Sequence, residues 1–172
     1  MQSTFAEFYH RYQRELYYYL LKVTGCVDDA AELMQESFAR YFEHYHHEQP
    51  SRSLLYTVAR NASIDRFRQH HEHVAFDPEC HAQSSESLET EACQREQFKN
   101  VLCAMQHLPL DEREVLALAT IEDLSYREIA SILGWSEGNV KVRVHRARQA
   151  LRQVLSHSRK QARVSTGGHH EE

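Results

Sequence analysis

Hydrophobic side chains recur at three- and four-residue steps along most of the chain, and this spacing is typical of amphipathic helices. The first such repeat covers residues 5–23, and Gly25 follows it as a C-terminal stop signal. A second repeat covers residues 30–45, and Asp28 or Asp29 is placed to act as its N-cap. The chain is therefore predicted to begin with two helices.

The stretch His44–Pro50 breaks the hydrophobic repeat and is interpreted as a loop. Ser51 or Ser53 can cap a third helix, whose apolar stripe covers residues 55–67. Three helices joined by short connections can close one small core. Residues 1–69 are therefore predicted to form a first helical domain.

A polar, acidic and serine-rich stretch without a hydrophobic repeat covers residues 70–87 and is interpreted as a linker. The helical repeat resumes at Leu88 and stops at Pro109. A second helical domain is predicted over residues 88–158, followed by a tail over residues 159–172. The predicted fold class is all-α, with two small domains joined by a flexible acidic linker.

Two helix starts in the second domain have the spacing of a capping box. In this motif the side chain of the N-cap residue accepts from the backbone N–H of the residue three positions later, and the side chain of that residue accepts from the backbone N–H of the N-cap. The first pair is Asp111 with Glu114, and the second is Ser125 with Glu128. The helix after Ser125 ends at Gly134, where the chain turns into a further helix. Two helices joined at a glycine-containing turn form a helix-turn-helix motif.

The last helix has the pattern of a DNA-recognition helix, whose N-terminal residues meet base edges in the major groove. Val140, Val144 and Ala147 can hold it to the domain. Arginine and lysine can bind guanine, asparagine can pair with adenine, and a valine can contact a thymine methyl group. An ordinary amphipathic helix with a solvated basic face is the alternative. The residues assigned to this surface are Ser136, Asn139, Lys141, Val142, Arg143, His145 and Arg146.

The distribution of charge supports DNA binding, although the net charge of the chain is −5. Residues 136–163 are strongly basic, with Glu137 as their acid, whereas residues 72–96 are strongly acidic. A phosphate backbone responds to the local charge rather than to the total. The basic side chains of the first stretch are Lys141, Arg143, Arg146, Arg148, Arg152, Arg159, Lys160 and Arg163.

Several motifs of the second domain resemble conserved region 4 of the sigma-70 family of RNA polymerase sigma factors. They are Leu108-Pro109, Arg113-Glu114-Val115, the segment 124–130, Gly134 and the segment 140–148. In that family, region 4 reads the −35 promoter element. The resemblance therefore implies that the helix-turn-helix binds −35 DNA.

The first domain resembles region 2 of the same family, and its segment 29–38 resembles the acidic helix that docks on the polymerase clamp. Asp29, Glu32 and Glu36 follow one another at three- and four-residue steps, so they share one face of a helix. A solvated charged face is the alternative. The residues implied in polymerase binding are Asp29, Glu32, Leu33, Met34, Gln35 and Glu36.

The segment 55–68 resembles the part of region 2 that opens and reads the −10 element. Extrusion of a base from the stack costs on the order of a few kcal/mol, which stacking and edge hydrogen bonds offset. Arginines can track the phosphates. Asn61 and Asp65 can equally form a polar pair that braces the helix. The residues implied in −10 binding are Arg52, Ser53, Tyr56, Arg60, Asn61, Arg66 and Arg68.

Three positions depart from the usual pattern of the family. Leu54 stands where members usually have Trp, so Tyr56 is the candidate to supply an aromatic ring for strand opening. Ala31 replaces a usual acid of the acidic helix, which leaves more of the polymerase contact to its neighbours. Val142 replaces a common Ser, and this change is expected to shift the −35 preference.

Histidines are frequent, 13 in 172 residues, and several of them stand near a cysteine in the linker. Nitrogen and sulfur ligands suit zinc, but the spacing matches no closed zinc motif, so neither a metal nor a cofactor is expected. A metal- or redox-responsive protein and an ordinary helix-turn-helix regulator, which binds duplex DNA as a dimer, remain the alternatives. The linker group is His70, His71, His73, Cys80 and His81.

The resemblance covers nearly the whole chain, and the lack of further domains indicates the extracytoplasmic-function (ECF) class. It implies a promoter-specificity subunit for a stress or signal-responsive regulon, with core RNA polymerase (clamp and flap regions), promoter DNA and an anti-sigma factor as partners. The acidic linker is either a flexible tether or, as the resemblance implies, a segment that threads the nucleic-acid channel of the polymerase. The chain has no P-loop, HExxH or GxSxG motif, so no enzyme is expected. Neither an export signal nor a long apolar run is present, so we expect a cytoplasmic protein without membrane insertion.

Overall fold

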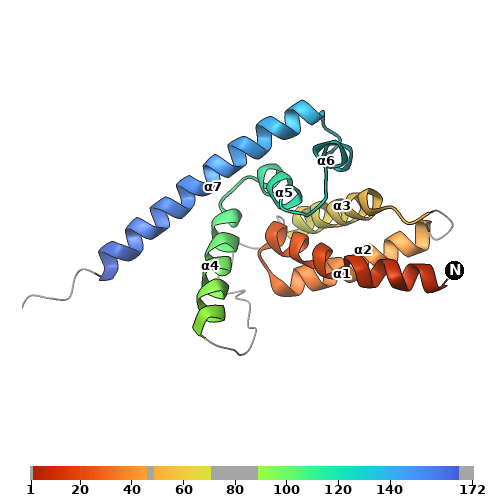
Figure 1. Ribbon diagram of the computed structural model, residues 1–172, viewed down its shortest axis with the longest axis horizontal. Helices are drawn as coiled ribbons and strands as arrows, with labels where there is room; N and C mark the ends of the chain where they lie inside the picture. The colour runs from red at the N-terminus through yellow and green to blue at the C-terminus, as the bar shows by residue number, and fades with distance from the viewer. Residues whose placement is uncertain (1, 46–48, 71–88, 167–172) are drawn as a thin grey trace, which may run out of the picture.

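The computed structural model describes residues 2–45, 49–70 and 89–166 of the chain (Figure 1). Every regular element in these residues is a helix, which confirms the predicted all-α class. The helices are α1 (Gln2–Thr24), α2 (Val27–Tyr45), α3 (Arg52–His70), α4 (Glu89–Gln106), α5 (Leu110–Leu118), α6 (Tyr126–Leu133) and α7 (Glu137–Thr166).

The first three helices pack on one another around an apolar core. Leu20 of α1, Leu33 of α2 and Leu55 of α3 are fully buried, and each comes from the predicted apolar stripe of its helix. Next to them Phe8 stacks on Tyr41 with a centroid distance of 5.3 Å. Removal of these apolar side chains from water is the main force that closes the three helices into one unit.

The other four helices also pack on one another, with α7 against α4, α5 and α6, and their buried residues belong to the same hydrophobic cluster as those of the first three helices. Val140, Val144 and Ala147 are buried along one stripe of α7, as the sequence predicts. Ile129 of α6 and Leu118 of α5 are buried opposite them. The C-terminal part of α7 projects away from the rest of the molecule (Figure 1).

Three local expectations need correction. α2 begins at Val27, directly after the reversal at Gly25 (φ 73°), so Asp28 and Asp29 lie in its first turn and complement the helix dipole instead of capping it. α7 continues to Thr166, well into the segment predicted to be a tail.

The third correction concerns the start of α5. Pro109 occupies its N-cap position without a side-chain cap, and Asp111 stands in the first turn. Glu114 does not reach back to the helix start as a capping box requires, because its side chain is buried and is bound to Arg60 of α3. The spacing alone therefore suggested a local role for a residue whose partner is distant.

The two halves of the molecule also pack against each other. α5 lies against α1, and α6 lies against α3, while α4 contacts α1 as well (Figure 1). The sequence predicted two domains and a linker, but it gave no sign of this contact. The contact positions the candidate site residues of α3.

Candidate nucleic-acid interface

The acidic face of α2 is joined to α3 by Arg66. The Arg66 guanidinium donates to Asp29 Oδ1 and to Glu32 Oε2, both at 2.9 Å. The hydrogen bond to Glu32 is the main cause that raises the pKa of Arg66. The Glu32 side chain stays 67% exposed. Residues predicted for two different partners, polymerase and −10 DNA, therefore form one cluster.

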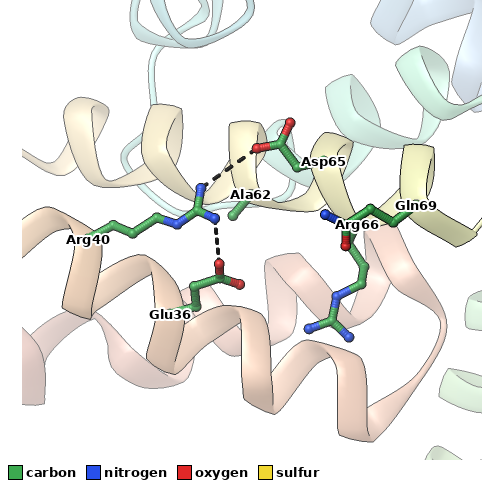
Figure 2. A pocket seen from close by; sticks show the side chains of 6 residues that line it. All are labelled: Glu36, Arg40, Ala62, Asp65, Arg66 and Gln69. Atoms are coloured by element: carbon green, nitrogen blue, oxygen red, sulfur yellow. Dashed lines mark hydrogen bonds and ion pairs between the residues drawn. The ribbon is translucent and has the colours of Figure 1, made fainter.

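A second polar cluster lines a shallow pocket between α2 and α3. Arg40 lies between Glu36 Oε1, at 2.5 Å, and Asp65 Oδ2, at 3.7 Å (Figure 2). Asp65 is thus paired with α2 and not with Asn61, the neighbour that the sequence suggested. Arg40 was not singled out from the sequence, although its spacing of four from Glu36 is a usual signal for a helical ion pair.

The remaining α2 candidates differ in accessibility. Leu33 is fully buried in the core, so it offers no surface to a partner in this conformation. Met34 is half-buried, and Gln35 is exposed. Of the residues predicted to bind the polymerase, the acidic side chains, Met34 and Gln35 therefore keep accessible surface.

At the start of α3, Ser51 and not Ser53 is the cap, because its hydroxyl accepts from the Leu54 backbone N–H at 3.4 Å. Arg52 donates to Glu15 Oε1 at 2.9 Å and to the backbone carbonyl of Glu122 at 2.7 Å. Glu122 lies in the turn before α6. The Arg52 side chain is therefore shared between the two halves of the molecule, and Ser53 beside it is half-buried.

Tyr56 is fully buried, and its hydroxyl donates to Glu15 Oε1 at 2.7 Å. Burial and this hydrogen bond raise the pKa of Tyr56. Its ring meets Tyr19 edge to face at 5.3 Å. A ring enclosed in this way cannot stack on a DNA base in this conformation.

Further along α3, Arg60 Nε donates to Glu114 Oε2 of α5 at 3.2 Å. Asn61 and Arg68 are exposed. Of the predicted −10 residues, the arginines at 52, 60 and 66 are thus all bound to acidic or carbonyl oxygens of the same chain. Glu15 and Glu114, which hold two of them, were not recognised from the sequence as site residues.

The helix-turn-helix is built by local sequence signals. Ser125 and Glu128 form the predicted capping box, with the Glu128 backbone N–H 3.2 Å from Ser125 Oγ and the Ser125 N–H 2.9 Å from Glu128 Oε2. α6 ends at Gly134, whose φ of 69° is the left-handed conformation that glycine adopts without strain. Ser136 Oγ then accepts from the Asn139 backbone N–H at 3.2 Å and caps α7, as predicted.

The outward face of α7 presents side chains that DNA could reach. Val142 is 49% exposed, and His145 and Arg146 are exposed as well. Lys141 is exposed and pairs with Glu137 at 2.8 Å, which raises the pKa of Lys141 and lowers that of Glu137. This face carries the residue types that the sequence assigned to base and phosphate contacts.

Arg143 differs from its neighbours on α7 because its guanidinium is held in place. It donates to Asn139 Oδ1 at 3.1 Å, pairs with Asp111 of α5, and lies 4.4 Å from the centre of the Trp135 ring. Trp135, in the turn, was not singled out from the sequence. Because arginine favours stacking on tryptophan, this contact braces α7 against α5 and the turn.

Comparison with known proteins identifies both halves. Residues 8–72 match the family model of Sigma-70 region 2, and residues 98–151 match that of Sigma-70, region 4. The ECF RNA polymerase sigma factor SigM of Bacillus subtilis is 34% identical over 89% of this chain and 96% of its own length. The chain belongs to the ECF sigma factors. Members of this family are promoter-specificity subunits of RNA polymerase, and this chain has both of their promoter-directed regions.

Other members and solved structures agree with the assignment. SigW of Bacillus subtilis, another ECF sigma factor, is 29% identical over 90% of both chains. The sigma factor RpoE in complex with the anti-sigma factor NepR from Bartonella quintana superposes with a TM-score of 0.69 over 88% of this chain and 96% of that chain, at 22% identity. CnrH in complex with the cytosolic domain of CnrY superposes with a TM-score of 0.68 over 91% of this chain and 90% of that chain, also at 22% identity. At this identity the two structures bear on the fold alone.

Two further expectations concern metals and membranes. Within residues 2–45, 49–70 and 89–166, no group of three or more histidine, cysteine or acidic side chains is placed to hold a metal ion. The predicted linker group lies outside the described residues, apart from His70 at the end of α3. In the same part of the chain, no helix has the length and apolar character needed to cross a membrane.

Proposed function

We propose that this ECF sigma factor divides its work between three surfaces. The acidic face of α2, with Asp29, Glu32 and Glu36, docks on the clamp of core RNA polymerase. The arginine-bearing side of α3 binds the −10 element. The outward face of α7 reads the −35 element, and the half that carries it contacts the polymerase flap.

The observation that carries this proposal is the construction of α6 and α7. A capped helix, a left-handed glycine and a second capped helix form the helix-turn-helix, and the stripe of Val140 and Val144 turns the basic face outward. In a helix-turn-helix of this construction the first turns of the second helix enter the major groove, which supports the assignment of α7 to the −35 element. Exposure supports Lys141, Val142, His145 and Arg146 as the readers, with Asn139 and Ser136 at the helix start.

Control by an anti-sigma factor is part of the proposal. Two of the solved structures that the fold resembles are complexes with NepR and with the cytosolic domain of CnrY. We infer that this chain is likewise held inactive by a protein that covers its polymerase- or DNA-binding surfaces. Because polymerase and promoters are in the cytoplasm, the protein acts there as a non-catalytic initiation factor.

In-vitro transcription tests the proposal. Purified core polymerase is mixed with a library of promoter fragments, with and without the protein. We expect transcripts that depend on the protein and share −35 and −10 elements. A free-standing helix-turn-helix regulator, the other candidate, would bind duplex promoter DNA tightly without polymerase and give no such transcripts. That result would overturn the proposal.

A further inference from the structure

We propose that two arginines, one on α3 and one on α2, are positioning residues for the acidic face that docks on the polymerase. Arg66 holds the carboxylates of Asp29 and Glu32, and Arg40 holds that of Glu36. The sequence assigned Arg66 to −10 DNA and gave Arg40 no role. This inference rests on the proposed docking of α2 on core polymerase, and it moves Arg66 from the DNA-binding surface to the polymerase-binding one.

Arg66 joins two acids that stand three positions apart on α2. Its Nη1 donates to Asp29 Oδ1 and its Nη2 to Glu32 Oε2, both at 2.9 Å. The planar fork of arginine fixes the direction of each bond, whereas a lysine ammonium group turns freely on a flexible stem. Because Arg66 belongs to the neighbouring helix, it fixes both acids relative to α3 as well as to each other.

These bonds leave both acids able to bind a partner. The Arg66 side chain is 25% exposed, whereas those of Asp29 and Glu32 are 31% and 67% exposed. Each carboxylate gives one oxygen to Arg66, and its other oxygen accepts no hydrogen bond from the residues that the structure describes. Arg66 is thus the more enclosed member of each pair, and a donor of the polymerase can bind the remaining oxygens.

Arg40 makes a similar bridge one turn further along α2 (Figure 2). Its Nη2 donates to Glu36 Oε1 at 2.5 Å, and its Nη1 lies 3.7 Å from Asp65 Oδ2 of α3. Both arginines line the pocket between the two helices, together with Glu36 and Asp65. The acidic face is therefore tied to α3 at two points, once by an arginine of α3 and once by an arginine of α2.

Small side chains allow the close approach of the helices that these bridges need. Ala59, Ala62 and Ser63 of α3 are buried, and so are Ala30 and Ser37 of α2, while the two helices pack against each other. The distance that each arginine spans is thus set by packing, which gives the carboxylates a defined place on the molecule.

Positioning and net charge predict opposite effects of these arginines on polymerase binding. A carboxylate that is already fixed loses less conformational freedom on association, so a positioning arginine strengthens binding. An arginine also cancels part of the negative charge that attracts a basic partner, so by charge alone it weakens binding. The sign of the effect of removing Arg66 therefore separates the two explanations.

The first test measures the affinity of the full-length protein, labelled at its N-terminus with a fluorophore, for core polymerase. We expect Arg66→Ala to bind core about tenfold more weakly, although it makes the face more acidic, because two acids lose their anchor. Arg68→Ala removes the same charge from an exposed position of the same helix and should keep the wild-type core affinity. Equal or tighter core binding by Arg66→Ala would overturn the inference.

Promoter binding by the holoenzyme, formed at saturating core polymerase, gives a second readout. An arginine that binds a DNA phosphate adds about one unit to the slope of log affinity against log salt concentration. Arg66→Ala should keep the wild-type slope, whereas Arg68→Ala, at a position assigned to −10 DNA, should lower it by about one. A lower slope in Arg66→Ala would return Arg66 to the DNA-binding surface.

A double-mutant cycle tests whether Arg66 acts through the acids that it holds. We expect Arg66→Ala to weaken core binding less in a Glu32→Ala background than in the wild type, because one of its two acids is then absent. Fully additive losses would mean that Arg66 does not act through Glu32, and this result would contradict the inference.

Two further variants extend the test. Arg66→Lys keeps the charge without the planar fork, and it covers the case in which Arg66→Ala fails to fold, as circular dichroism would reveal. Positioning predicts that Arg66→Lys binds core several-fold more weakly than the wild type, whereas equal affinity would mean that charge alone matters. Arg40→Ala should show a smaller loss than Arg66→Ala, because Arg40 holds one acid of the face, and unchanged core affinity would remove Arg40 from the inference.

The outcomes separate this inference from the proposed function. If Glu32→Ala weakens core binding but Arg66→Ala does not, the positioning role is wrong and the docking of α2 on the polymerase stands. If the wild type does not bind core, or if Glu32→Ala binds core as the wild type does, the proposed docking itself fails. Weaker core binding by folded Arg66→Ala, with an unchanged salt slope and a non-additive cycle, would support the inference.

Discussion

The two basic surfaces of this sigma factor, on α3 and on α7, have opposite relationships to the rest of the chain. On α3, Arg52, Arg60 and Arg66 are all bound by oxygens of neighbouring helices or turns. On α7, Val142 and Arg146 face solvent, and Lys141 pairs only with the residue one turn before it. The surface proposed to read the −35 element is thus accessible to duplex DNA, whereas the arginines proposed to bind the −10 element are already paired within the chain.

This difference shows that a run of basic residues in a sequence determines the local charge. It does not determine which of these side chains are free to bind DNA. An arginine bound to a buried carboxylate has already been desolvated, and DNA must replace that partner rather than water. The same distinction applies inside α7, where Arg143 is held by Asp111 and Trp135 while Arg146 is not.

Reversal of charge at Glu32 should have the largest effect. Glu32→Lys places a cation beside Arg66 and removes an exposed acid from the proposed polymerase face. We expect core binding and protein-dependent transcription to be lost, as measured by co-purification with core polymerase and by transcript yield. Glu96→Lys, an equal reversal on an exposed position of α4, is the control. Normal transcription from the Glu32 variant would remove α2 from the polymerase interface.

The two α7 arginines should respond differently to truncation. Arg146→Ala should weaken −35 binding by about 1–3 kcal/mol, which is roughly five- to 160-fold, because an exposed base or phosphate contact is lost. Arg143→Ala should weaken binding and also lower the free energy of unfolding, because it removes the brace to Asp111 and Trp135. Holoenzyme binding to promoters with altered −35 bases, together with urea unfolding, measures both quantities.

Equal behaviour of the two variants would contradict this prediction. If Arg143→Ala left the free energy of unfolding unchanged and relaxed the preference at one base, Arg143 would be a direct reader. If Arg146→Ala changed neither affinity nor preference, α7 would have to lie on the DNA through a different face.

Loss of the α6 cap should cost stability in the second half alone. Ser125→Ala removes the acceptor of the Glu128 N–H, and we expect a loss of about 1 kcal/mol in the free energy of unfolding. Ser131→Ala, at an exposed position inside the same helix, is the matched control. Urea unfolding, monitored by the fluorescence of the single Trp, measures the free energy of unfolding of both variants. An equal change in the two variants would mean that the capping box makes no measurable contribution to stability.

The smallest predicted effect is a pH dependence of the contact between the halves. Burial raises the pKa of Glu114 above its ordinary value of 4.5, although Arg60 opposes this shift, with Asp111, Arg113 and Tyr19 as the other ionisable groups nearby. Because the pKa of Glu114 is raised where the two halves are in contact, protonation of Glu114 favours this contact. The contribution is complete below the ordinary pKa of a glutamate and is lost as the pH rises through the raised value.

Scattering curves of the wild type recorded from neutral to mildly acidic pH should therefore show more compact molecules at the lower pH. Glu114→Gln, which cannot titrate at this position, should show a weaker dependence. A pH profile shared by both proteins would assign the effect to other groups.

Much of the fold could be predicted from the sequence because the signals are local. Helical periodicity, the Ser125 box, the left-handed Gly134 and the Ser136 cap each depend on residues within one or two turns, and the structure has all of them. The buried stripe of α7 and the family motifs follow the same spacing, so the helix-turn-helix and the sigma family could be recognised without coordinates.

The state of the site was decided only by the tertiary structure. Arg60 and Glu114 are 54 positions apart, and Arg52 and Glu122 are 70 apart, so no local pattern links them. Tyr56 carries an aromatic ring suited to stacking, but its helix turns it into the core. The sequence determined which residues have the chemistry to bind DNA and polymerase. Which of them are free to do so depends on packing between distant helices, because burial and ion pairing are properties of the assembled molecule.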